Sequence, residues 1–308
     1  MSLIHGMSIT DQATTGNVGA EHRLHLNDKL QKFSLTKRGR ETFTLAIRAH
    51  LSQASAMSLK AINFYARIAF SEAFTAGFEE YCTTNDVREV FFVTVVQQEQ
   101  AFPVREAVAF DITGCKTTMA DLLNDLDFIG IVEGAYYYTA PFAHRKEPQI
   151  SWHSHAIVWG VSRQEIAERV RASNERMIAF VPGYKAAHVR LISPATALSY
   201  CRYMTKNILK EYTAYPKKRE TIDGATGEII VQPSGKWRNR KREIRPSGFV
   251  RAFSAFENKT LKQVTFASGK GRPLRKKIFK QTIALLSAEA AARDARIRYR
   301  LLGSSTPP

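Results

Sequence analysis

The sequence contains few cysteines and no long apolar run. Its three cysteines (Cys82, Cys115 and Cys201) are odd in number and widely spaced, so they fit neither a zinc-ligand pattern nor a disulfide framework. No apolar stretch approaches the roughly 20 residues that a transmembrane helix needs, and residues 1–30 lack the apolar segment of a secretory signal. We therefore expect a cytoplasmic protein with no membrane partner.

Acidic residues are also scarce relative to basic ones. The chain has 45 Lys and Arg against 28 Asp and Glu, a formal charge of +17. Residues 216–308 hold 22 of the basic and seven of the acidic residues, and so carry 15 of the 17 net charges. A positive field this concentrated indicates a polyanionic partner, most often nucleic acid, although a solvated basic tail has the same composition. A Walker-type phosphate loop is missing, which excludes an evident ATP-driven helicase.

Hydrophobic periodicity predicts an α+β protein. The expected elements, in chain order, are one or two helices over 42–81, a strand at 89–97, a helix within 111–127, strands at 128–138 and 150–160, a helix at 162–172, a strand at 187–192 and a helix at 193–211. The short connection over 140–149 implies that the strands on either side of it pair antiparallel. We expect a central antiparallel sheet with helices packed on it.

Changes in composition divide the chain into four parts. We expect a loose N-terminal arm over 1–40, a helical region over 41–85, the sheet domain over 88–215 and a basic DNA-binding region over 216–308. Residues 222–229 predict a hairpin turn. The candidate DNA-binding residues are Lys210, Lys236, Trp237, Arg238, Arg240, Lys241 and Arg242. Trp237 suits either stacking on a base or anchoring a loop.

The strand at 150–160 contains a candidate metal site. Residues two apart on a strand point to the same face, so His153 and His155 project side by side. Glu133 lies among apolar residues of the preceding strand, where an unpaired carboxylate is costly, so it either points to solvent or has a partner. We expect Glu133 to be the third ligand; His144, in the turn between the two strands, is the alternative.

The helix at 193–211 supplies a candidate nucleophile. Tyr203 and Lys206, three residues apart, share one helical face, and Lys210 follows one turn later. A tyrosine hydroxyl has a reference pKa of about 10 and is a poor nucleophile at neutral pH. A nearby divalent cation and a lysine stabilise the phenolate and neutralise charge on an attacked phosphate. Taken singly, Tyr203 also fits a core-edge tyrosine and Lys206 a solvated lysine.

The three motifs together resemble the HUH endonuclease superfamily, which includes the rolling-circle replication initiators of plasmids and phages and related transposases and relaxases. Its signature is an apolar strand, a His-hydrophobic-His strand and a helix with Tyr-x-x-Lys or two tyrosines. The corresponding segments here are Phe91-Phe92-Val93-Thr94-Val95, Trp152-His153-Ser154-His155-Ala156-Ile157-Val158 and Tyr200-Cys201-Arg202-Tyr203-Met204-Thr205-Lys206. They occur in the order of the family, and the resemblance covers residues 88–212.

The sequence departs from the family pattern at two points. Ser154 stands where the family has a bulky hydrophobic residue, which leaves the alternation of the two histidines intact. Tyr200 and Tyr203 are separated by two residues, whereas two-tyrosine members usually have three between them. The single-tyrosine pattern fits better, so we predict Tyr203 as the nucleophile and Tyr200 as a second nucleophile or a substrate contact.

The resemblance implies a fold and a reaction. The fold would be a ferredoxin/RRM-like palm. His153, His155 and Glu133 would bind Mg²⁺ or Mn²⁺ at the scissile phosphodiester of single-stranded DNA, Tyr203 would form a 5′-phosphotyrosyl intermediate, and Lys206 would orient the phosphate or help to deprotonate the tyrosine. Such an enzyme would initiate rolling-circle replication in a bacterial cytoplasm, on origin duplex or hairpin DNA, with a host helicase and polymerase as possible partners. The alternatives are a transposase or relaxase of the same superfamily, and a non-catalytic nucleic-acid-binding protein.

Overall fold

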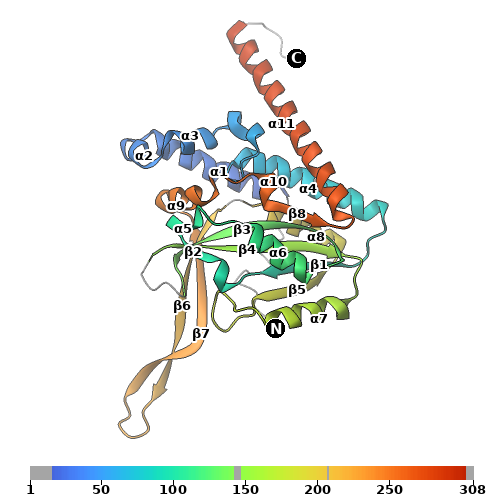
Figure 1. Ribbon diagram of the computed structural model, residues 1–308. Helices are drawn as coiled ribbons and strands as arrows, with labels where there is room; N and C mark the ends of the chain where they lie inside the picture. Colours follow the sequence, from blue (N-terminus) through green and yellow to red (C-terminus); the bar gives the residue numbers. More distant parts are fainter. Residues whose placement is uncertain (1–15, 142–146, 207, 303–308) are drawn as a thin grey trace.

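The strands of the protein form one sheet of mixed direction. The computed structural model describes residues 16–141, 147–206 and 208–302. The main path of the sheet runs β5-β1-β4-β3-β6-β7, with β2 paired to β4 and β8 to β3 (Figure 1). The strands are β1 (Val90–Val95), β2 (Ala101–Pro103), β3 (Asp127–Thr139), β4 (Gln149–Trp159), β5 (Ala187–Ile192), β6 (Lys210–Ile222), β7 (Ile229–Glu243) and β8 (Thr265–Ser268).

Helices precede the sheet, connect its strands and follow it. They are α1 (Gly16–Leu35), α2 (Lys37–Thr42), α3 (Leu45–His50), α4 (Phe64–Thr84), α5 (Val104–Ala107), α6 (Thr113–Leu122), α7 (Arg163–Asn174), α8 (Pro194–Met204), α9 (Pro246–Phe256), α10 (Leu261–Val264) and α11 (Gly271–Leu302), with short 3₁₀ turns η2 (Gln53–Ser58) and η3 (Gln98–Gln100). The prediction of an α+β protein is confirmed.

Four strands form an antiparallel unit in the order β5-β1-β4-β3. Helix α6 lies between β1 and β3 in the chain, and α7 lies between β4 and β5. Both helices pack on one face of the sheet, where Met119 of α6 and Ile166 of α7 share an apolar cluster with Phe91. Helices α4 and α8 cover the opposite face, on which Phe92 lies. Because strand side chains alternate, Phe91 and Phe92 serve these two different faces.

The prediction of a wholly antiparallel central sheet is wrong at one edge. Strand β6 pairs parallel with β3, with Tyr136 opposite Glu211 and Tyr137 opposite Tyr212. Helix α8 follows β5 at one edge of the four-stranded unit and precedes β6, which joins the unit beside β3 at the other edge. Because of this crossover, β6 runs in the same direction as β3. Strand β7, which forms a hairpin with β6, pairs antiparallel with it.

The N-terminal region contains a helix that the sequence does not predict, and the long helix predicted after it is divided into shorter elements. Residues 16–35 form α1, and its Leu26 and Leu30 are buried in the main core, so a loose arm is wrong for this part. The helix predicted over 42–81 is divided into α3, η2 and α4. Leu59 adopts a left-handed conformation with φ of 51°, which ends η2, and Asn63 then caps α4 with its side chain.

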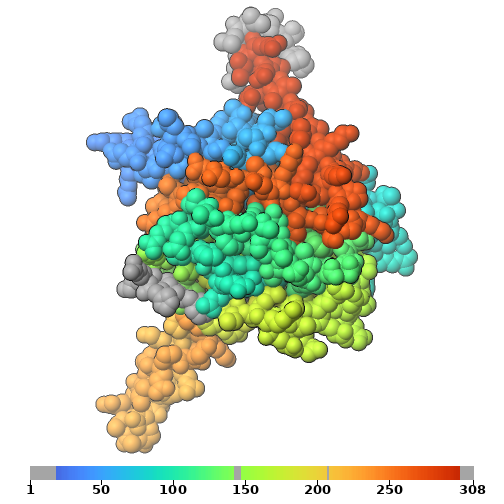
Figure 2. Space-filling view, viewed as in Figure 1, coloured from blue at the N-terminus to red at the C-terminus, as the bar shows by residue number. Residues whose placement is uncertain are grey.

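The C-terminal region packs into the same core as the sheet. Strand β6 crosses the boundary predicted between residues 215 and 216, so that boundary does not coincide with the end of an element. Strand β8 pairs with β3, and Phe279 of α11 stacks on Phe70 of α4 with ring centres 5.1 Å apart. Two parts of the region project from the body: the outer half of the β6–β7 hairpin and the end of α11 (Figures 1 and 2).

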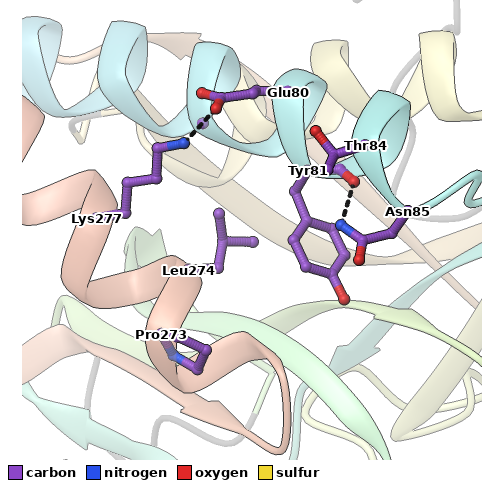
Figure 3. Close-up of a pocket in the computed structure, with 8 residues that line it drawn as sticks. Glu80, Tyr81, Thr84, Asn85, Pro273, Leu274 and Lys277 are labelled. Atoms are coloured by element: carbon purple, nitrogen blue, oxygen red, sulfur yellow. Dashed lines mark hydrogen bonds and ion pairs between the residues drawn. The ribbon is translucent and has the colours of Figure 1, made fainter.

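A shallow pocket of about 250 Å³ lies between the end of α4 and the start of α11 (Figure 3). Its wall includes the ion pair between Glu80 and Lys277, at 2.5 Å, and the ring of Tyr81. None of the predicted site residues lines it.

Within the described ranges, no helix has the length and apolar character required to cross a membrane.

Candidate metal and nucleophile site

Strands β3 and β4 bring the three predicted metal ligands together. Glu133 of β3 lies directly opposite His153 of β4, and His155 is the next residue on the same face. The Nε2 atoms of His153 and His155 lie 3.6 Å and 3.4 Å from Oε2 of Glu133. All three residues are buried, and their candidate ligand atoms lie within 4.8 Å of one another. They therefore form a buried group that can hold a metal ion.

Hydrogen bonds on the outer side of each ring orient the two imidazoles. Nδ1 of His153 lies 3.1 Å from the backbone carbonyl of Ser151, to which it donates in the tautomer that leaves Nε2 as an acceptor. Nδ1 of His155 lies 2.8 Å from Oγ1 of Thr94 on β1. Partners of this kind fix the ring orientation of metal-binding histidines. Both Nε2 atoms are thereby directed towards Glu133 of the site.

Two buried atoms of this group have no hydrogen-bond partner among the described residues. They are Oε1 of Glu133 and Nε2 of His155. A buried polar atom without a partner costs on the order of 1–3 kcal/mol, so such atoms in a folded protein require an explanation. Two imidazole nitrogens and one carboxylate are a donor set that divalent transition metals bind. The residues present therefore fit a divalent cation.

The charges of the site hold the ligands in the ionisation states that metal binding requires. Burial alone would raise the pKa of Glu133, but Lys206 and the two histidines hold it well below its usual value, so the carboxyl is ionised. Burial lowers the pKa of His155 to about 3, and the neighbouring charges of His153 and Lys206 lower it while Glu133 raises it. His155 is consequently a neutral imidazole at neutral pH, the form that ligates metals.

Tyr203 and Lys206 lie beside these ligands, although not on one continuous helix. Helix α8 ends at Met204, so Lys206 follows the helix end and Lys210 begins β6 instead of a further helical turn. The prediction that all three share a helical face is therefore wrong. Nζ of Lys206 nevertheless lies 2.5 Å from Oε2 of Glu133 and 3.6 Å from the ring centre of Tyr203.

The environment of Tyr203 keeps its hydroxyl protonated. Its ring centre is 5.4 Å from that of His155. Burial raises the pKa of Tyr203, and the negative charge of Glu133 raises it further. The phenol therefore needs an additional positive charge or a proton acceptor before it can attack a phosphate.

Tyr200 lies next to Tyr203 but its hydroxyl is engaged elsewhere. The two ring centres are 6.4 Å apart, and Phe92 of β1 packs against both rings. The hydroxyl of Tyr200 accepts a hydrogen bond of 3.0 Å from Nη1 of Arg190 on β5. Of the two predicted tyrosines, Tyr203 is thus the one whose ring lies beside His155 and Lys206.

Two buried arginines position the end of α8, and sequence reasoning missed them. Arg67 of α4 is 3% exposed and donates to the backbone carbonyl of Lys206 at 2.8 Å and to that of Ala61. Arg23 of α1 donates to the carbonyl of Arg202 at 3.0 Å. Carbonyl groups at a helix C-terminus lack partners within the helix and attract cations. An arginine within an otherwise hydrophobic stretch, as Arg67 is in 64–70, is the only sequence signal for this role.

The predicted DNA-binding residues lie on the β6–β7 hairpin. Lys236, Arg238 and Arg240 are exposed on β7, and Arg242 pairs with the buried Glu211. Trp237 is half-buried against the apolar cluster around Tyr137. This packing favours the anchoring role for Trp237.

Two of the predicted DNA-binding residues, Lys210 and Lys241, are not part of the candidate metal site. Lys210 starts the hairpin, opposite Glu243 of β7, and is half-buried there. Lys241 is half-buried on β7. His144, the alternative third ligand, lies outside the described residues. Among the described residues, Glu133 therefore remains the acid that accompanies the two histidines.

Comparison of the chain with protein-family models, with curated proteins and with solved structures gives no match.

Proposed function

We propose that this protein is a metal-dependent DNA endonuclease and strand transferase of the HUH type. It would nick and rejoin single-stranded DNA through a 5′-phosphotyrosyl intermediate and initiate rolling-circle replication of a plasmid or phage. The observation that supports this most is the convergence of His153, His155 and Glu133 with Lys206 and Tyr203. These five side chains come from strands β3 and β4, from helix α8 and from the residues directly after it.

The fold gives a second line of support. We propose that β1, β3, β4 and β5, with α6 and α7, form the ferredoxin/RRM-like palm of this superfamily. The chain order strand-helix-strand-strand-helix-strand and the antiparallel order β5-β1-β4-β3 agree with such a palm. The tyrosine helix α8 packs on the face that carries the histidines, opposite α6 and α7.

The metal would be Mg²⁺ or Mn²⁺, held by His153, His155 and Glu133. When bound, such an ion supplies positive charge to a phosphate oxygen of the substrate and lowers the barrier to attack. The side chains around it have defined tasks. Thr94 and the carbonyl of Ser151 hold the imidazoles in their orientation, and Lys206 balances the charge of Glu133.

Tyr203 would supply the nucleophile. Its Oη forms a bond to phosphorus, the bond from phosphorus to the 3′ oxygen breaks, and its electron pair remains on that oxygen, which takes up a proton. The phenol proton is released to solvent. The ammonium group of Lys206, 3.6 Å from the ring centre, favours the phenolate over the phenol and offers a charge to the phosphate. Because the phosphodiester energy is kept in the phosphotyrosine, a 3′ hydroxyl can later reverse the step.

Partners and location follow from the proposed reaction. The substrate would be single-stranded DNA exposed at an origin, with duplex or hairpin DNA bound beside it by the basic surface. A host helicase and polymerase would extend the free 3′ end, in a bacterial cytoplasm. The formal charge of +17 is in keeping with a polyanionic partner.

The test is the formation of a covalent adduct. Labelled single-stranded DNA from the replicon that encodes the protein is incubated with Mn²⁺ or Mg²⁺ and denatured, and protein-linked label is measured. We expect an adduct with the wild type and with Tyr200→Phe, and none with Tyr203→Phe or with His153→Ala/His155→Ala. An adduct lost only in Tyr200→Phe would show that Tyr200 is the nucleophile.

Loss of the adduct in every variant, wild type included, while DNA binding persists would contradict the proposed function. It would identify the protein as a non-catalytic nucleic-acid-binding protein. Transfer of the adduct to a second strand carrying transposon ends or a transfer origin would instead indicate the transposase or relaxase alternative.

A further inference from the structure

The β6–β7 hairpin is a long two-stranded ribbon rooted beside the candidate site. Strand β6 begins at Lys210, close after Lys206 in the chain, and its first residues pair with β3 along Tyr136 and Tyr137. Beyond Thr213 the two strands pair with each other alone among the described strands. Figure 2 shows this outer part leaving the body as a narrow arm. The ribbon thus extends from the strand that carries Glu133 into solvent.

Unpaired cations gather in the middle of this ribbon. We define the basic belt as the exposed residues Lys218, Arg219, Lys236, Arg238 and Arg240. None of the five forms an ion pair with any described residue; Arg240 lies over the ring of Tyr215, at 5.5 Å from its centre. At the root, in contrast, Glu211 binds Arg242 and Arg245. Clustered like charges without acidic partners repel one another, and a polyanion relieves this repulsion.

The tip of the ribbon exposes apolar side chains beside the acidic residues Glu220, Asp223 and Glu228, and these apolar side chains join none of the buried clusters of the described residues. Ile222 and Ile229 are 75% and 67% exposed, and Ile230 and Val231 are also exposed. An isolated two-stranded hairpin is at best marginally stable in water, because neither of its faces is covered. A partner that contacted both the belt and the tip would therefore stabilise the outer ribbon.

We propose that the ribbon binds duplex DNA next to the nicking site, with the basic belt on the phosphates and the tip in the major groove. The major groove is about 12 Å wide and admits a two-stranded ribbon. Apolar side chains at the tip can contact thymine methyl groups there. This inference rests on the proposed function, because it assumes that DNA is the substrate held at the root of the ribbon.

Charge favours DNA over a protein as the occupant. Each phosphate contact by Lys or Arg releases counterions, so five such contacts give a slope of about −4.5 when log K is plotted against log salt. A contact between apolar tips of two copies of this chain would bring two basic belts near each other and would be strengthened by salt.

The experiment measures binding to a labelled mixed-sequence duplex of about three helical turns by fluorescence anisotropy at several salt concentrations. The belt variant replaces Lys218, Arg219, Lys236, Arg238 and Arg240 with Gln. We expect its affinity to fall at least about 100-fold near 0.1 M salt and the salt slope to become shallower by about 4.5. A matched variant, Lys262, Lys270, Arg272, Lys276 and Lys280 to Gln, removes the same charge from exposed positions elsewhere. It should keep a slope within about one of the wild type.

The tip is tested by changing Ile222, Ile229, Ile230 and Val231 to Ser. We expect affinity to fall about three- to tenfold with the salt slope unchanged, because the lost contacts are apolar. Equal losses in the belt and matched variants would overturn the inference, since net charge alone would then govern binding. So would a tip variant that binds DNA normally but changes the sedimentation of the protein from dimer to monomer.

The covalent adduct on short single-stranded DNA separates this inference from the proposed function. The tip variant should form the adduct at the wild-type level, because Ile222, Ile229, Ile230 and Val231 lie neither among the metal ligands nor among the predicted DNA-binding residues. Loss of the adduct in the wild type would reject the proposed function. Loss of duplex binding only in the belt variant would still locate the DNA surface on the ribbon.

Discussion

The buried histidine His155 couples the metal ligands to the stability of the fold. Burial lowers its pKa to about 3 in the folded protein, while in the unfolded chain it is about 6.5. Between these values the unfolded chain binds a proton that the folded protein does not, so the free energy of unfolding rises with pH. The contribution of His155 to the free energy of unfolding therefore decreases as the pH falls below about 6.5, by up to about 1.4 kcal/mol per pH unit. Urea denaturation of the metal-free protein between about pH 7 and about pH 4.5 measures this slope.

The variant His155→Gln isolates this contribution, because glutamine does not titrate. We expect its stability to depend less steeply on pH, by up to about 1.4 kcal/mol per unit below about pH 6.5. His25→Gln, which removes an exposed histidine of α1, is the matched control and should follow the wild type. A His155→Gln curve as steep as that of the wild type would refute the assignment.

The ligand residues could be predicted because strand geometry is local. Alternation placed His153 and His155 on one face, and the short connection between β3 and β4 placed Glu133 beside them. Thr94 could not be predicted as the partner of His155, because that contact depends on the register between β1 and β4, which are far apart in the sequence.

At the scale of elements, the end of α8 is set by contacts that lie outside it. The sequence after Met204 retains helical spacing, which led to a predicted end near residue 211. In the structure Thr205 is the C-cap and bonds to Ser71 of α4 at 2.7 Å. Arg67 of α4 donates to the backbone carbonyl of Lys206, directly after the end of α8, and to that of Ala61. Tertiary contacts with α4 therefore override the local propensity.

Arg67 is consequently a positioning residue for Tyr203 and Lys206. We expect Arg67→Met to destabilise the fold by about 3 kcal/mol, because buried carbonyls lose their donor. We also expect adduct formation per folded molecule to fall at least about tenfold, because a lost hydrogen bond of about 1.4 kcal/mol in the reacting geometry has that effect. Urea denaturation and the adduct assay measure the two effects.

The control for Arg67→Met is a variant of similar stability on the other face of the sheet. Ile166 of α7 is 1% exposed and packs with α6, away from the histidines. Ile166→Ala should also cost about 3 kcal/mol. Its adduct formation per folded molecule should match the wild type. If both variants lose the adduct alike, Arg67 acts through stability alone.

At the scale of the whole molecule, composition located the basic residues but not their packing. The excess of positive charge after residue 216 suggested a separate DNA-binding region. The apolar residues of the same region, among them Leu274, Ile278 and Phe279, join the core formed by α4. The charge of each residue can be read directly from the sequence. Whether an apolar residue is buried in a core depends instead on which helices and strands pack against each other in the folded protein. Long-range pairing of the kind that joins β8 to β3 leaves no local pattern.

This packing predicts that the C-terminal region is indispensable for folding. Removal of residues 265–308 takes away β8, which pairs with β3, and α11, whose Leu274, Ile278, Phe279 and Leu286 are buried. Burial of four such side chains is worth about 8 kcal/mol, within the range of the total stability of a domain. We expect the truncated chain to lose cooperative thermal unfolding, measured by circular dichroism. Removal of residues 293–308 alone takes away the end of α11, where residues 294–298 are exposed, and should lower Tm by only a few degrees. Cooperative unfolding of the longer truncation would show instead that the sheet domain folds without its C-terminal region.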